Sequence, residues 1–479
     1  MYRKEMTELF SAFDRCIEKD KVQLAESVRN LVKVRSVAGN PGIGEPCGHG
    51  PATALHAALD IASALGFFTK NLDNYVGFAE YGEGKDYIAV LGHLDTVPEG
   101  EHWTFPPFNG DIHDGRIFGR GVLDDKGPIL SALFGLKAIR DSGVTLPRRI
   151  RIIFGTDEET GDQDIAYYHS KENPPVCGFT PDSEFPVVFA EKGILHVDLS
   201  RSSSPGKLNS SDDFLVSCTG GEAVNMVPGL AVAEIRTGNP GNIILKCNEF
   251  ADVSGFSISA EQEGDLVVVR SEGVSSHGSK PHLGKNAITQ LLGFLSTLQF
   301  EPVEISSIIR FLQKKIGMDT TGVLFGLDLA DDPSGHLTLN AGLVRYSGRD
   351  FILSVDIRYP VTDTMASVME HLLGSLKGQG FTVTIRKHQP PLYYPPESDL
   401  IRTLAAIYHD VTGDSCPPVS IGGGTYARKL PNIVAFGPYF PGKTNNIHAV
   451  DESMGCEELV MITKIYARAM HILAKEGHS

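Results

Sequence analysis

Short apolar runs alternate with helical segments in the first third of the chain, and this alternation constrains the fold more than any other feature. Tyr87–Leu91 and Arg149–Gly155 have the length and the apolar content of buried strands. Between them, Pro128 occupies a first helical turn, and apolar residues at helical spacing continue to Ile139. Strand, helix and strand in this order predict an α/β layer with a mostly parallel sheet.

The pattern changes near residue 194. Several alternating strand-like runs follow, among them Phe351–Tyr359, with helical stretches at Ala287–Leu298 and Met365–Lys377. Helices return after residue 390 and run to Lys475. A chain of 479 residues is too long to form one compact core. We therefore expect an α/β domain from 1–193 and 391–479, interrupted by a large α+β domain at 194–390.

Composition excludes several classes of partner. The formal net charge of −16 would repel the phosphates of nucleic acid. The seven cysteines are scattered without a CxxC pair, which argues against a disulfide framework and against a thiolate zinc site. The charged N-terminal segment does not resemble a signal peptide, and no stretch of about 18 apolar residues occurs. We expect a cytoplasmic protein without a membrane or nucleic-acid partner.

Acidic residues and histidines follow the predicted strands directly. His93 and Asp95 come just after Tyr87–Leu91. On an extended backbone, residues two apart point the same way, so Asp95 can hold the His93 ring in one tautomer. Taken alone, such a pair is more often an ordinary polar loop.

Two further segments are richer in carboxylates. Asp124 and Asp125 precede the predicted helix, where they can either cap its N-terminus or bind a cation. Asp157, Glu158 and Glu159 follow a buried strand and repel one another unless a cation gathers them. Adjacent side chains diverge, so one of the two glutamates can bind metal while the other faces a water molecule. A solvated acidic loop is the alternative.

Asp182 and the distant His448 complete this set. Two histidines and at least three carboxylates, with no cysteine among them, suit a pair of borderline-hard divalent ions. We expect Zn²⁺, with Mn²⁺ and Co²⁺ as alternatives.

Four motifs in this order, HLDTVPEG, GRGVLDDKGP, GTDEETG and PDSEFP, resemble the co-catalytic metallopeptidase and deacylase family. That family includes acetylornithine deacetylase, succinyl-diaminopimelate desuccinylase and carboxypeptidase-G-type enzymes. The segments DNYVGFAEYGEG, HWTFPPFNGDI, SSHGSKPHLGKNA, IGGGTYAR and NNIHAVDE are most similar to bacterial dipeptidases of the PepV type. The resemblance extends from about residue 30 to the C-terminus and is weakest between about 195 and 220.

The resemblance implies a role for each residue of the metal set. Asp124 would bridge two metal ions. His93 and Asp182 would complete one metal site, and Glu159 and His448 would complete the other.

It also implies the catalytic residues. Glu158 would be the general base for a metal-activated water, and Asp95 the acid that orients His93. His277 would be the histidine of a lid domain, formed by the insert, that stabilises the oxyanion.

Substrate contacts follow from the same resemblance. Arg358 offers a bidentate fork for a substrate carboxylate, and Asn225 matches a lid residue near the substrate. Gly423 and Thr425 lie in a glycine-rich turn that permits close approach of a ligand, although a plain tight turn fits equally well.

We therefore expect a metal-dependent dipeptidase, with Xaa-His and β-alanyl dipeptides among its candidate substrates. The alternative is an N-acyl amino acid amidohydrolase of the desuccinylase or deacetylase type with the same dinuclear site. A non-catalytic binding protein is a third class, which the complete set of matched positions argues against. An insert of this size implies a monomer, because family members with an insert about half as long usually borrow a histidine from a second subunit.

Overall fold

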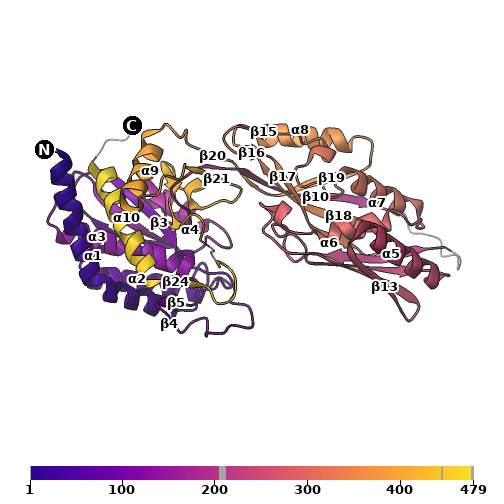
Figure 1. The fold of residues 1–479 in the computed structure, drawn as a ribbon, viewed down its shortest axis with the longest axis horizontal. Helices are drawn as coiled ribbons and strands as arrows, with labels where there is room; N and C mark the ends of the chain where they lie inside the picture. The colour runs from indigo at the N-terminus through magenta and orange to yellow at the C-terminus, as the bar shows by residue number, and fades with distance from the viewer. Residues whose placement is uncertain (1, 204–211, 444–445, 476–479) are drawn as a thin grey trace. The chain divides into compact units, whose positions relative to one another are not determined.

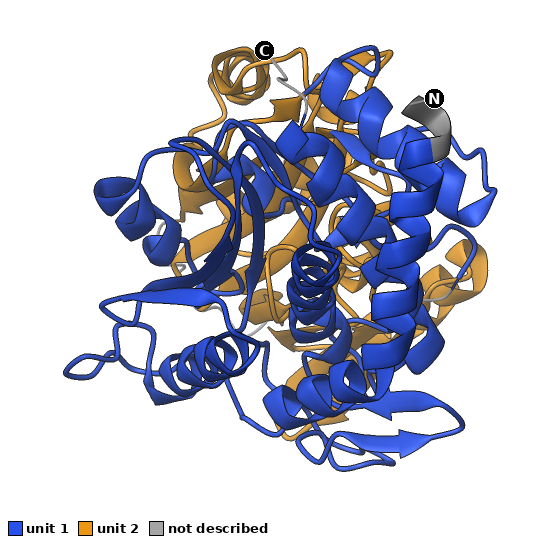
Figure 2. Ribbon diagram, turned by 90° about the vertical axis from the view of Figure 1, so that its left-hand side faces the viewer, with its two compact units in different colours: residues 1–189, 394–419, 424–479 blue, residues 190–393, 420–423 orange. Residues whose placement is uncertain are grey.

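A computed structural model describes residues 2–203, 212–443 and 446–475. The chain divides into two compact units, coloured separately in Figure 2. The first unit contains residues 1–189, 394–419 and 424–479, and the second contains 190–393 and 420–423. Each unit has its own sheet and its own helices (Figure 1).

The sheet of the first unit is mixed. Its strands lie in the order β1 (Phe68–Leu72), β2 (Val76–Tyr81), β6 (Arg149–Gly155), β3 (Tyr87–His93), β7 (Cys177–Thr180), β22 (Ile433–Ala435) and β9 (Val188–Glu191), the last of which extends past the end of this part of the unit at residue 189. The four strands β6, β3, β7 and β22 are parallel, whereas the pairings on either side are antiparallel. The α/β class is confirmed.

The expectation of a mostly parallel sheet holds only for this centre. A tight turn joins β1 to β2, with Asp73 and Asn74 at positive φ, and two strands joined in this way must run antiparallel. Between β3 and β6, by contrast, the chain crosses over through α3 (Gly127–Asp141), which allows the parallel pairing seen there.

Helices from both ends of the chain pack together in the first unit. They are α1 (Tyr2–Val32), α2 (His49–Ala64), α3, α4 (Gln163–Lys171), α9 (Asp399–Thr412) and α10 (Cys456–Lys475). Nearly every residue of α3 is buried, and it contacts both α1 and α10. A side chain at Gly135 would meet Met470 at 3.0 Å, so glycine allows this close approach of α3 to α10. The C-terminal segment is therefore part of the same core as the N-terminal third.

Two small sheets connect distant segments of this unit. In one, β24 (Ser453–Gly455) pairs with β5 (Arg116–Phe118), which pairs with β4 (Asp111–His113). In the other, β23 (Pro438–Tyr439) pairs with β8 (Ser183–Glu184). Both bring C-terminal residues beside segments that carry the predicted site.

The second unit has a fully antiparallel sheet. Its strands lie in the order β13 (Ser257–Glu263), β14 (Leu266–Glu272), β12 (Leu230–Arg236), β11 (Phe214–Gly220), β17 (Thr338–Tyr346), β18 (Asp350–Tyr359), β10 (Gly193–Ser202) and β19 (Thr382–Gln389). Its helices are α5 (Pro240–Ser254), α6 (Ala287–Leu295), α7 (Val303–Lys315) and α8 (Met365–Leu376). Apolar side chains alternate along β10 and β18 and join one hydrophobic core.

The two halves of this sheet repeat one arrangement. The hairpin β11–β12 is followed by α5 and the edge strand β13, and the hairpin β17–β18 is followed by α8 and the edge strand β19. Each edge strand is separated from its hairpin by one further strand, β14 in one half and β10 in the other. The second unit is therefore an approximate duplication of one smaller sheet.

Among the described residues, no helix combines the length and apolar character needed to cross a membrane.

Candidate functional site

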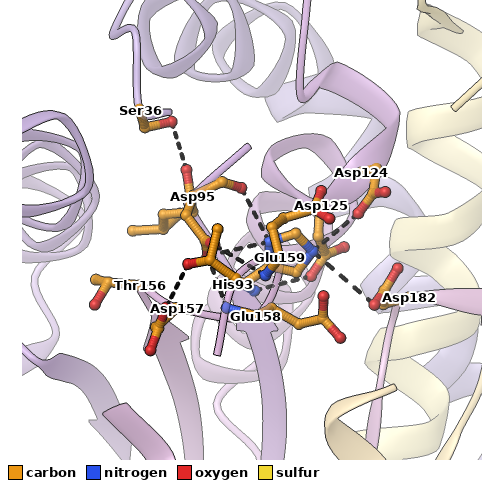
Figure 3. Close-up of polar contacts among 12 residues, drawn as sticks. Ser36, His93, Asp95, Asp124, Asp125, Thr156, Asp157, Glu158, Glu159 and Asp182 are labelled. Carbon is orange, nitrogen blue, oxygen red and sulfur yellow. Dashed lines mark hydrogen bonds and ion pairs between the residues drawn. The ribbon is translucent and has the colours of Figure 1, made fainter. Parts of the chain in front are cut away.

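The predicted metal ligands converge where three neighbouring parallel strands end (Figure 3). His93 is the last residue of β3, Asp182 follows β7, and Glu158 and Glu159 follow β6. Because parallel strands end at the same edge of a sheet, their C-terminal residues share one place in space. This is the usual location of a ligand site in an α/β sheet.

Asp124 lies at the centre of this group. Its Oδ1 is 2.9 Å from Nε2 of His93, and its Oδ2 is 3.0 Å from Nε2 of His448. The same nitrogen of His448 is 3.1 Å from Oε1 of Glu159, and Nε2 of His93 is 3.9 Å from Oδ2 of Asp182. One carboxylate therefore faces two imidazoles, and each imidazole faces a second carboxylate.

Two overlapping groups of these side chains are compact enough to hold an ion. Ligand atoms of His93, Asp124 and Glu159 lie within 4.8 Å of one another, and so do those of His93, Glu158 and Asp182. Imidazole nitrogen and carboxylate oxygen are the donors that Zn²⁺ and related divalent ions accept. The donor set therefore fits metal ions.

The crowding of acids raises the affinity of this site for positive charge. Burial raises the pKa of Glu158 to about 8, and the negative charges of Glu159 and Asp124 add to this effect. Burial and the charge of Asp124 also raise the pKa values of Glu159 and of Asp182. Despite its burial, Asp124 has a pKa far below the ordinary range because both imidazoles hydrogen-bond to it. Cations bound here would relieve the repulsion among these groups.

The orientation of the His93 ring follows from its contact with Asp95. Nδ1 of His93 lies 3.0 Å from the backbone oxygen of Asp95, and a carbonyl oxygen can only accept a hydrogen bond. Nδ1 therefore carries a proton, and Nε2 is the ring nitrogen that faces Asp124. The Asp95 carboxylate is 3.4 Å from Nδ1, and it also accepts hydrogen bonds from the backbone N–H groups of Glu158 and Glu159, at 3.2 and 3.0 Å. Asp95 thus orients His93 and also holds the loop that carries both glutamates.

Asp125 is turned away from the ligand group. Its side chain is buried, and its Oδ2 accepts a hydrogen bond from the backbone N–H of His93 at 3.3 Å. Asp124 and Asp125 therefore differ in role, a choice that the residue pattern alone left open.

Asp164 and Tyr426 support the site, although the sequence pattern did not indicate either of them. The buried Asp164 carboxylate accepts hydrogen bonds from the N–H groups of Thr156 and Asp157, at 2.7 and 3.2 Å, and from the hydroxyl of Tyr426. The Tyr426 ring meets the His93 ring edge-on, with centroids 6.1 Å apart. An acid in the first turn of α4, just after the acidic loop, was the available signal for Asp164.

In the second unit, Asn225 and His277 lie side by side. The backbone oxygen of Asn225 accepts a hydrogen bond from Gly278 N–H at 2.7 Å. Both side chains belong to exposed residues. The N–H of Ser279 donates to Nδ1 of His277 at 3.2 Å, so Nδ1 is an acceptor and the neutral ring carries its proton on Nε2. The N–H donor of a neutral His277 ring is therefore the one on Nε2.

Arg358 is paired within the second unit. Its guanidinium forms a bidentate pair with Asp356, at 2.8 and 2.9 Å, and donates to the backbone oxygen of Gly422 at 2.9 Å. Arg358 is only 3% exposed. Gly423 follows Gly422 in the same unit, whereas Thr425 is buried in the first unit, where its hydroxyl accepts a hydrogen bond from Ala427 N–H.

A family model described as "Peptidase family M20/M25/M40" matches residues 89–471. "Putative dipeptidase YtjP" of Bacillus subtilis (strain 168) is 36% identical over 467 residues, which cover 95% of this chain and 98% of that protein. "Putative dipeptidase SH1171" of Staphylococcus haemolyticus (strain JCSC1435) is 32% identical, with coverage of 96% and 99%.

Solved structures share the fold at lower identity. Human carnosine dipeptidase 1 aligns with a TM-score of 0.57 and 14% identity, covering 97% of this chain and 99% of that one. An M20 family metallo-carboxypeptidase, Sso-CP2 from Sulfolobus solfataricus, aligns with a TM-score of 0.54 and 16% identity, covering 94% and 99%. At these identities the likeness concerns the fold alone.

Proposed function

The chain belongs to peptidase family M20/M25/M40, and we propose that it is a dipeptidase that hydrolyses the peptide bond at a dinuclear metal centre. The observation that carries this proposal is the placement of Asp124, whose two oxygens each face a different imidazole, with Glu158 among the neighbouring acids. The relatives named as dipeptidases support the choice of dipeptides as the substrate class.

We assign the ligands as two sets that share Asp124. His93 and Asp182 belong to one set, and Glu159 and His448 to the other. Zn²⁺ is the expected ion, with Mn²⁺ and Co²⁺ as alternatives, because the donors are imidazole and carboxylate without thiolate. When bound, such ions polarise the scissile carbonyl and lower the pKa of a water molecule.

Glu158 is the proposed general base. It is the neighbour of a ligand in sequence, but its side chain diverges from that of Glu159. Its raised pKa, about 8 in the absence of cations, shows an environment that favours uptake of a proton. The glutamate takes the proton from the attacking water and then delivers it to the leaving amine. The Asp95 carboxylate keeps the Glu158 backbone in place through its N–H.

The second unit is the proposed lid, with His277 as its catalytic residue. The Nε2–H of His277 can donate to the oxyanion that forms on the carbonyl oxygen, since Nδ1 is already an acceptor for Ser279. Asn225, Arg358 and Gly423 of this unit, with Thr425 of the first, are the proposed substrate contacts. The pairing of Arg358 with Asp356 implies that a substrate carboxylate shares this guanidinium with an internal acid.

We propose that the enzyme acts as a monomer. The duplicated sheet of the second unit supports this, because one chain then contains two copies of the element that a dimer would bring from two subunits.

The test is to remove metal with a chelator, restore Zn²⁺, Mn²⁺ or Co²⁺ separately, and assay dipeptides, tripeptides and N-acyl amino acids. Dipeptides should be hydrolysed fastest, and only after metal is restored. Tripeptides cleaved as fast as dipeptides would contradict the dipeptidase assignment. Activity on N-acyl amino acids alone would instead identify an amidohydrolase with the same centre.

A further inference from the structure

Asp124 and His448 are more than 300 residues apart, and one buried ion pair joins the two segments that carry them. The pairing of β24 with β5 first brings these segments together. Next to the two strands, Nη1 of Arg120 lies 2.7 Å from Oε2 of Glu452, and the two side chains are 2% and 0% exposed. A charge pair this deeply buried is costly to desolvate, so its retention calls for a reason other than stability alone.

Glu452 holds the turn that presents Asp124. Its Oε1 accepts hydrogen bonds from the backbone N–H groups of Leu123 and Asp124, at 2.9 and 3.3 Å. Its Oε2 accepts from the N–H of Gly121 at 3.1 Å and from Arg120. This turn, η1 (Val122–Lys126), has non-helical φ and ψ at Asp124 and Asp125, so its own backbone pattern does not determine where Asp124 points. The carboxylate of Glu452 supplies hydrogen-bond acceptors for the backbone N–H groups of this turn.

Arg120 holds the loop that presents His448. One nitrogen of its guanidinium donates to Glu452, and the other donates to the backbone oxygens of His448 and Glu99, at 3.2 and 3.3 Å. His448 has a φ of 59°, in the left-handed region that residues other than glycine rarely adopt. The bond to its carbonyl helps to keep the imidazole turned towards Asp124 and Glu159. Trp103 covers the guanidinium, with the ring centroid 5.2 Å away.

We propose that Arg120 and Glu452 form a positioning pair that sets the spacing between Asp124 and His448 and so preassembles the metal site on the His448 side. Neither residue belongs to the assigned ligand sets. The proposal rests on the dinuclear centre proposed above, and it adds two residues that act through ligands rather than as ligands. Partners of this kind typically change metal affinity by about 10- to 100-fold when they are replaced.

Arg120→Lys is the most informative variant. A lysine keeps the positive charge beside Glu452, but its single nitrogen cannot also serve as the planar fork that reaches the His448 carbonyl. Glu452→Gln is the second variant, and it removes the charge while retaining the length of the side chain.

Arg116→Lys is the matched control. Arg116 also joins the β5 segment to the C-terminal segment, through Ser453 and Glu458 at 3.0 to 3.4 Å. These bonds anchor the same strand but do not include the His448 carbonyl or the turn of Asp124.

The experiment measures Zn²⁺ affinity and stoichiometry by chelator competition, and the absorption spectrum during Co²⁺ titration. Thermal melting of each metal-free protein reports whether the fold is retained. In the wild type we expect two ions. In Arg120→Lys, the first ion should bind as in the wild type, whereas the second should bind about 10- to 100-fold more weakly. In Glu452→Gln, both affinities should fall, because Asp124 contributes to both sets. Arg116→Lys should match the wild type.

Two results would overturn the proposal. One is wild-type affinity for both ions in a folded Arg120→Lys protein. The other is an equal loss of metal affinity in Arg116→Lys, which would indicate general anchoring of the segment.

If Arg120→Lys does not fold, unchanged metal affinities in Glu452→Gln overturn the proposal. If neither variant folds, the pair is required for folding and the proposal is wrong. Failure of the proposed function is distinct, since a wild-type protein that binds fewer than two ions contradicts the dinuclear centre itself.

Discussion

At the scale of single residues, neighbours in the sequence take different environments. Glu158 and Glu159 are adjacent, yet Glu159 contacts His448 whereas Glu158 groups with His93 and Asp182. Asp124 and Asp125 differ in the same way, since one faces two imidazoles and the other accepts a backbone N–H. The chemistry of the site thus depends on the direction of individual side chains.

Replacement of Glu158 by Gln should lower kcat by about 10²- to 10⁴-fold, because the amide cannot accept the proton of the attacking water. Zn²⁺ content and KM should stay close to those of the wild type. Glu159→Gln is the contrasting variant. It should bind less metal, because Glu159 is an assigned ligand, while the Glu158 carboxylate is retained. Steady-state kinetics and metal analysis on both proteins check this, and full activity in Glu158→Gln would disprove the assigned base.

Replacement of His277 by Ala should lower kcat by about 10²- to 10³-fold, the range observed when one oxyanion donor is removed. Metal content should not change, because His277 belongs to the second unit and the assigned ligands to the first. His282→Ala is the matched control, an exposed histidine in the same segment. Equal kinetics in the two variants would argue against an oxyanion role for His277.

At the scale of elements, packing between helices determines where ionisable groups lie. The ring of His471, in α10, is fully buried and meets Phe10 and Phe13 of α1 edge-on. Neither of its nitrogens has a hydrogen-bond partner among the described residues. Burial, together with the nearby Lys475, lowers the pKa of His471 to about 4.

The contact of His471 with α1 should make stability dependent on pH. In the unfolded chain this histidine titrates near its ordinary value of 6.5, so the unfolded state takes up the proton first. The free energy of unfolding therefore has its full value above about pH 6.5. It decreases as the pH falls towards 4, by about 3 kcal/mol in total.

His471→Leu should remove this dependence. Its melting temperature relative to the wild type should therefore rise as the pH falls from 7 to 4. Calorimetry at several pH values measures the difference, and a constant offset between the two proteins would show that His471 does not titrate in this range.

At the scale of the whole molecule, metal binding should stabilise the first unit. Buried carboxylates of the centre repel one another in the absence of cations, and any ion that binds only the folded state adds to its stability. Treatment with a chelator should lower the melting temperature, and Zn²⁺ should restore it. An unchanged melting temperature would mean that the centre does not bind the ion appreciably under these conditions.

The duplicated sheet of the second unit predicts a monomer. Light scattering should give a mass near 51.8 kDa. Mixing His277→Ala and Glu158→Ala chains should restore no activity, because in a monomer both residues must come from the same chain. A tight dimer with restored activity on mixing would show that the histidine comes from a second subunit.

Much of the centre could be predicted from the sequence because strand ends leave a local pattern. His93, Glu158, Glu159 and Asp182 each follow a short apolar run, and the α/β class follows from the same runs. The antiparallel flanks of the sheet could not be predicted in this way, since pairing direction depends on which strands become neighbours.

By itself, the sequence determined the class of the fold and the donor types available to the proposed centre, since periodicity and residue type are local properties. Only the tertiary structure decided that Asp125 turns inward, that Asp164 and Tyr426 support the acidic loop, that Asp356 pairs with Arg358, and that Arg120 and Glu452 join the segments of Asp124 and His448. These are contacts of buried polar groups, and most such groups take their hydrogen-bond partners wherever the packed chain provides them, often far away in the sequence.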